Sequence, residues 1–144
     1  MFDLNLGKQV NRLTGPVIAA GLLLGVVAVP LSWAKIMINT IDPVAVGTEG
    51  GRHVVVTGPI TCTLGERAYL SVTLTQRTTG ATAEGTTLVT CTDVIEQWSV
   101  DAVVKGKQGF EPGPAVAVAV ATTVQRGTTS DAHQWLVNVT IVPE

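Results

Sequence analysis

Apolar residues alternate with Thr or Ser along most of the chain after residue 35, and clusters of Gly, Pro and Asp interrupt this alternation. A period of two is typical of β-strands that have one face on a core and the other in solvent. No segment of this part shows the spacing of an amphipathic helix. The pattern predicts an all-β domain with seven strands. The expected strands span residues 36–46, 53–62, 68–75, 86–91, 95–104, 115–125 and 133–142.

Two of the expected strands contain residues that disturb regular pairing. The first is interrupted by Asp42 and Pro43. We place it at a sheet edge, because proline has no N–H to offer a neighbouring strand. The second contains Gly58 and Pro59, so we expect a bend or bulge there. A turn region rich in Thr and Gly is expected over residues 78–85.

The alternation also predicts which side chains face the core. In the third strand Leu70 and its alternate neighbours should face inward, with Tyr69 outward. Trp98 is expected at the centre of the core, and Trp135 on the inner face of the last strand. In the strand over 115–125 the valines are expected to face the core and the alanines to form a flat outer face. These residues are Val116, Val118, Val120 and Val124 on one side and Ala115, Ala117, Ala119 and Ala121 on the other.

Strands at this spacing predict a two-sheet antiparallel β-sandwich of immunoglobulin-like type. A closed β-barrel is the alternative. In antibody domains the core tryptophan lies between the two cysteines, whereas Trp98 follows both Cys62 and Cys91. The strand topology should therefore differ from that of an antibody domain.

The N-terminal segment has the organisation of a signal peptide. Every residue from 17 to 29 is apolar or Gly, and Lys8 and Arg12 precede this run. Ser32 and Ala34 supply the small residues that a signal peptidase requires, so we expect cleavage after Ala34. The expected domains are a signal peptide over 1–34 and a single β domain over 35–144. An uncleaved membrane anchor is the alternative, and in either case the β domain lies outside the cytoplasm.

Cys62 and Cys91 are the only two cysteines. An even count in an exported chain predicts a disulfide between them. A redox pair or a metal site is the weaker alternative. A metal site would need further ligands, and His53 and His133 have no partner of ligand type at i, i+3 or i, i+4.

Composition excludes several classes of function. Charged residues make up 14% of the chain and the net charge is −2, so there is neither a basic nucleic-acid-binding footprint nor an acidic tail. His53 and His133 are the only histidines, and no nucleophile turn of the G-x-S-x-G type is present. The carboxylates are scattered among expected turns and outer faces. We therefore expect a non-enzymatic protein without catalytic, cofactor-binding or metal-binding residues.

Binding is the expected mode of action. Tyr69 and Phe110 are the candidate contact residues, although a loop phenylalanine more often plugs the end of such a fold. The expected partner is a second copy of the chain or another extracellular protein, with a membrane involved only if the N-terminal segment is uncleaved. The alternative is a carrier that holds a small apolar ligand among Leu70, Trp98 and Trp135.

A scattered set of residues over positions 40–142 carries a resemblance to a known group of proteins. The set is Gly58, Cys62, Gln76, Cys91, Trp98, Phe110, Pro112, Gly113 and Ala115. In this ordered pattern the chain resembles small exported actinobacterial β-sandwich domains of unassigned function. The resemblance implies export and a two-cysteine β fold, and it provides no catalytic residues.

Overall fold

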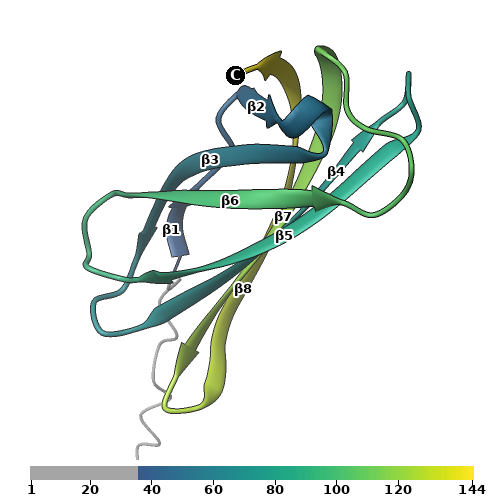
Figure 1. Cartoon of the computed structure of the whole chain (residues 1–144). Helices are drawn as coiled ribbons and strands as arrows, with labels where there is room; N and C mark the ends of the chain where they lie inside the picture. The colour runs from purple at the N-terminus through teal and green to yellow at the C-terminus, as the bar shows by residue number, and fades with distance from the viewer. Residues whose placement is uncertain (1–35) are drawn as a thin grey trace, which may run out of the picture. The chain divides into compact units, whose positions relative to one another are not determined.

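The computed structural model describes residues 36–144, which form one compact unit, so the expected signal peptide and its cleavage site lie outside the described residues. Figure 1 shows an all-β arrangement in this part of the chain, which confirms the expected class. No helix among residues 36–144 is long and apolar enough to cross a membrane. The strands are β1 (Ile36–Asn39), β2 (Val44–Thr48), β3 (His53–Cys62), β4 (Arg67–Gln76), β5 (Ala81–Thr90), β6 (Glu96–Val104), β7 (Gly113–Gln125) and β8 (Thr128–Pro143), with a short 3-10 turn, η1 (Glu49–Gly51), before β3.

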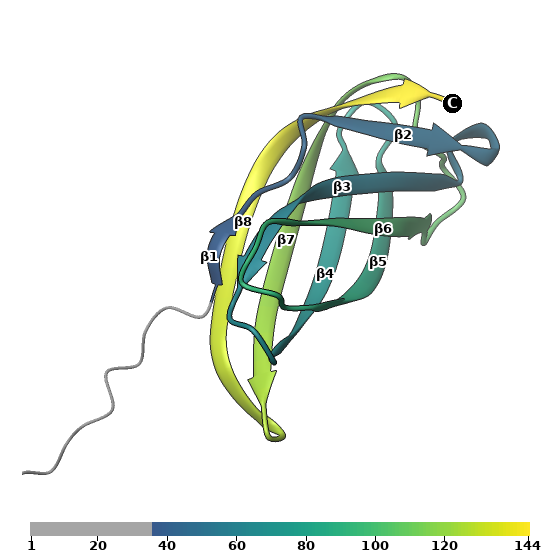
Figure 2. The same cartoon turned by 90° about the vertical axis from the view of Figure 1, so that its left-hand side faces the viewer.

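Seven of the strands close into a barrel, in the order β2-β8-β7-β4-β5-β6-β3 and back to β2 (Figures 1 and 2). β1 lies beside the second half of β3. The closed barrel is the alternative of the sequence analysis, and the principal expectation, a two-sheet sandwich, is wrong. The difference depends on two short seams. β2 joins β8 in parallel over four residue pairs, and β5 joins β6 over two.

Both seams lie toward the same end of the barrel, which we call the closed end; it also carries η1. The β5–β6 seam pairs Glu84 with Val103, and Val103 pairs in turn with His53, which follows η1. Toward the opposite end, the pairing between β5 and β6 stops. β3 is the only described strand with which β1 pairs there. We call this the disulfide end, because Cys62 and Cys91 are bonded there, with 5.1 Å between their Cα atoms. The expected disulfide is confirmed.

The interior follows the predicted faces in most strands. In β4, Leu70 and its alternate neighbours are buried and Tyr69 is exposed, as expected. Trp98 on β6 is almost fully buried. It lies over Gly58, where an added Cβ would sit 2.1 Å from the Thr40 carbonyl oxygen and 2.7 Å from the indole. Gly58 therefore permits a close approach of Thr40 and Trp98. The register between β3 and β6 runs through this position without a shift, so of the expected bend or bulge there is no bulge toward β6.

The two faces of β7 are the reverse of the prediction. The alanines are buried, and the valines lie half-exposed on the outer face. The register explains this, because inward positions of β7 stand opposite large inward side chains: Ala121 pairs with Leu70, and Ala119 with Trp135. Small residues opposite large ones fit the narrow interior of a small barrel. Valine at these positions would overfill it.

Three element boundaries also differ from the prediction. The first expected strand is two strands, β1 and β2, separated at Asp42 and Pro43. Most of the turn expected over 78–85 belongs to β5, which pairs with β4 at ten successive positions. β8 begins at Thr128, five residues before its expected start, and forms a long hairpin with β7.

Candidate functional site

The outward residues of β8, β7, β4 and β5 form a continuous surface with few charged residues. Outward residues of the four strands stand side by side in rows, such as Leu136, Val118, Thr73 and Glu84, or Gln134, Val120, Ser71 and Thr86. The four rows together hold one charged residue, Glu84. We call this surface the outer face. Its members are Tyr69, Ser71, Thr73, Thr75, Thr82, Glu84, Thr86, Leu88, Val116, Val118, Val120, Thr122, Ala132, Gln134, Leu136 and Asn138.

Tyr69 lies on this face and is 45% exposed. It pairs with Leu88 on β5 and with Thr122 on β7, toward the disulfide end. These residues, with Val120, line a shallow groove of about 520 Å³ that opens to solvent. An aromatic ring beside aliphatic side chains in an open groove suits contact with an apolar or mixed surface.

Phe110, the other predicted contact residue, is 4% exposed and belongs to the core. It lies in the loop before β7, and its N–H donates a hydrogen bond of 2.9 Å to the Gly51 carbonyl. A side chain at Gly51 would collide with the Phe110 backbone, at 1.9 Å from its carbonyl oxygen. Phe110 thus plugs the closed end of the barrel, the role that the sequence favoured for a loop phenylalanine.

Gln76 fixes the loop that carries Phe110. Its buried side-chain amide donates to the Glu111 carbonyl at 2.8 Å and accepts from the Glu111 N–H at 2.8 Å. Thr79 donates a third hydrogen bond to the same amide oxygen at 3.0 Å. Beside this loop, a depression of about 460 Å³ lies between η1, Glu111 and the last residues of β8. Gln76 was among the residues of the sequence resemblance, and its hydrogen bonds give it a structural role.

Both histidines contact carboxylates. One of these, Glu49, lies four residues before His53, so the expectation that His53 has no ligand-type partner at this spacing is wrong. His53 Nδ1 lies 3.0 Å from Asp101 on the neighbouring strand, and His53 Nε2 lies 3.5 Å from Glu49. In a catalytic triad, Nε2 would face a nucleophile; here it faces a second carboxylate. His133 lies within β8, not at a strand start as expected, and its Nε2 is 3.2 Å from Asp131.

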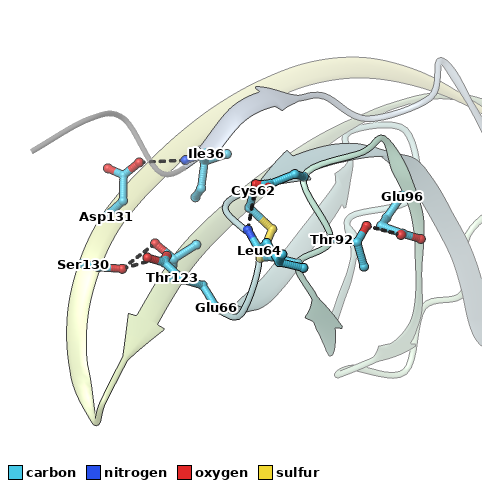
Figure 3. Close-up of a disulfide and its surroundings, with 11 residues drawn as sticks. Ile36, Cys62, Leu64, Glu66, Thr92, Glu96, Thr123, Ser130 and Asp131 are labelled. Atoms are coloured by element: carbon cyan, nitrogen blue, oxygen red, sulfur yellow. Dashed lines mark hydrogen bonds between the residues drawn. A yellow bond between two sulfur atoms is a disulfide. The ribbon is translucent and has the colours of Figure 1, made fainter.

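Glu66 departs from the expectation that the carboxylates are solvated. It is fully buried near the disulfide end, where Ser130 donates a hydrogen bond of 3.0 Å to its carboxylate. The same hydroxyl lies 2.9 Å from Thr123, which is also buried (Figure 3). This polar group joins the β3–β4 turn to β8. A buried carboxylate with hydroxyl partners is not visible in a turn sequence such as Leu64-Gly65-Glu66.

Metal binding finds no support in the described residues, because no group of three or more His, Cys, Asp or Glu residues among positions 36–144 could hold an ion. In comparisons with known proteins, no family model matches the chain, and no curated protein matches it significantly. The resemblance to exported actinobacterial domains stays a prediction.

Proposed function

We propose that this chain is an exported, non-enzymatic domain that acts by binding at the cell surface or outside the cell, and that the outer face is the binding surface. The observation that carries the proposal is the composition of this face, on which Glu84 is the single charge among four rows of residues. Charged side chains normally keep exposed sheet faces apart. The disulfide adds support for export, since such bonds persist in oxidising compartments.

A second copy of the chain is the partner that this face fits best. Two uncharged sheet faces can stack about 10 Å apart and bury their aliphatic side chains against each other. Leu136, Val118 and Leu88 would provide most of the apolar contact. From strand and residue spacing, the face covers on the order of 500 Å². Stable interfaces bury about 800 Å² per partner, so the expected association is weak and depends on concentration.

Sedimentation equilibrium of the whole protein over a wide concentration range tests this proposal. We expect a reversible dimer or higher oligomer at high concentration. The double variant Val118→Lys with Leu136→Lys places charges on paired positions of the outer face, so it should leave only monomer. Ile38→Lys is the control, because Ile38 is 46% exposed on β1, which pairs with β3 and not with a strand of the outer face. Monomer alone at the highest concentration would contradict self-association.

The alternative, a carrier of a small apolar ligand, retains one supporting observation. The indole N–H groups of Trp98 and Trp135 are buried without a hydrogen-bond partner in the protein. A ligand with one acceptor atom could satisfy either group. Leu70 and Trp98 are packed in the core, however, so the outer face remains the better supported site. Solvent extraction of the purified protein followed by mass spectrometry would show a carried molecule. Protein that contains no bound molecule would exclude the carrier function.

A further inference from the structure

Three large aliphatic side chains project from the disulfide end. Leu64 in the β3–β4 turn is 64% exposed, and Val94 and Ile95 in the β5–β6 turn are 61% and 62% exposed. The two turns lie together because Cys62 and Cys91 are bonded. We call Leu64, Val94 and Ile95 the apolar tip. These are among the most exposed large apolar residues of the described chain, and they lie on turns, where polar residues are usual.

The two turns that carry the apolar tip are hydrogen-bonded to each other. Leu64 N–H donates to the Asp93 carboxylate at 2.7 Å, and Asp93 N–H donates to the Cys62 carbonyl at 3.2 Å. Gly65 N–H donates to the Cys91 carbonyl at 3.3 Å. Transfer of a turn with unpaired N–H groups from water to an apolar medium is unfavourable, because each unpaired group costs free energy there. The paired N–H groups of Leu64, Gly65 and Asp93 lower that cost and hold the two turns together.

The chain enters the barrel beside the apolar tip. Ile36, the first described residue, pairs with Cys62, and its N–H donates to Asp131 at 3.1 Å (Figure 3). Met37, next along β1, is 58% exposed. Six residues, 30–35, separate the apolar run over residues 17–29 from Ile36. If this segment stays uncleaved, the seven peptide units from residue 29 to Ile36 reach at most about 25 Å, so a bilayer that holds the run lies within that distance of Ile36.

We propose that the apolar tip inserts into the interfacial region of a lipid bilayer, so that the domain stands on the membrane with its disulfide end down. Leu64, Val94 and Ile95 would enter the acyl boundary. Exposed Arg67, at the start of β4, would remain at the level of the lipid phosphates. Asp93, whose carboxylate must stay near water, limits the depth of insertion. This surface is distinct from the outer face, and its lipid contact can fail without affecting self-association.

The test uses the whole protein, as its expression host processes it, with vesicles of phosphatidylcholine and a minor fraction of phosphatidylglycerol. A photo-crosslinking amino acid replaces Val94 in one variant and Val103, at the closed end, in the matched control. We expect roughly tenfold more lipid adduct by mass spectrometry at position 94 than at position 103, because the apolar tip alone reaches the acyl boundary. Equal yields at the two positions, or no lipid adduct at position 94, would overturn the inference.

A second pair of variants separates membrane contact from folding. Leu64→Ser with Ile95→Ser, in the position-94 crosslinking variant, should abolish most of the lipid adduct. The control Leu136→Ser removes a similarly exposed side chain from the outer face and should leave the yield unchanged. Intact mass of the disulfide-closed chain and circular dichroism verify that each variant is folded. Crosslinks to a second copy of the chain in place of lipid would mean that the tip is a protein interface and not a membrane contact.

Discussion

The two ends of the barrel are held together by different means. At the closed end, β2 pairs with β8 and β5 pairs with β6, while Gln76 binds the loop that carries Phe110. At the disulfide end these strand pairings are missing, and a covalent bond together with hydrogen bonds between the turns takes their place. The disulfide thus lies where the sheet is open. One end is stabilised by pairing and the other by a cross-link, which leaves the side chains at the cross-linked end free to project.

The largest effect on stability is expected from a substitution in the core, which both ends of the barrel share. Trp98→Ala removes an almost fully buried indole that packs over Gly58. We expect a loss of about 3 to 5 kcal/mol in the free energy of unfolding, measured by urea denaturation. Trp135→Ala is the control, with a smaller loss, since Trp135 is only partly buried. Equal losses of unfolding free energy would mean that Trp135 contributes as much to the core as Trp98.

Removing the disulfide would sharpen the contrast between the ends. The double variant Cys62→Ser with Cys91→Ser opens a loop of 29 residues and should cost about 3 to 4 kcal/mol on the chain-entropy view. Hydrogen exchange should rise at the end of β5 and in β1 and change little at the β2–β8 seam. An unchanged melting temperature would contradict the role assigned to the bond.

Gln76→Ala tests the closed end in the same way. It leaves the N–H and carbonyl of Glu111 without their partner and should cost about 1 to 3 kcal/mol. Faster hydrogen exchange is expected in the loop over 105–112 and not in the turns of the disulfide end. Thr75→Ala, at the exposed neighbouring position, is the control. Faster hydrogen exchange in the turns of the disulfide end as well would show that the two ends are not independent.

The smallest effect is expected from an outward position of β7, compared with an inward position of the same strand. Ala119→Val adds volume opposite Trp135 and should cost about 1 to 3 kcal/mol through overpacking. Val118→Ala, on the outer face, should cost less than about 1 kcal/mol in the monomer. Thermal unfolding at low protein concentration measures both. A larger loss for Val118→Ala than for Ala119→Val would mean that the valines face the core, as the sequence alone predicted.

The sequence predicted the strands whose two faces differ in chemistry. β4 alternates aliphatic residues with Thr, Ser and Tyr69, so its boundaries and faces were readable. β7 alternates alanine with valine, and both are apolar, so the period of two could not say which set is inside. β5 is rich in Thr and Gly and resembles a turn until its pairing with β4 is known. Closure into a barrel depends on six residue pairs in two seams, which no local pattern records.

The candidate sites were readable only in part. Tyr69 could be placed on an outer face, because its strand alternates clearly. The apolar tip could not be predicted, because Leu64, Val94 and Ile95 look like core residues until the disulfide brings their turns together. The pairing of His53 with Asp101 likewise depends on the register between β3 and β6.

The parallel seam between β2 and β8 has a consequence for how the chain folds. Val44 pairs with Thr140, so the ring joins residues from opposite ends of the described chain. Such distant contacts form slowly, because a long loop must close before any of them stabilises the structure. Until β8 has left the ribosome and any export channel, β2 and β7 keep unpaired edges that can capture other chains. Protection of these edges by a chaperone would matter most in that interval.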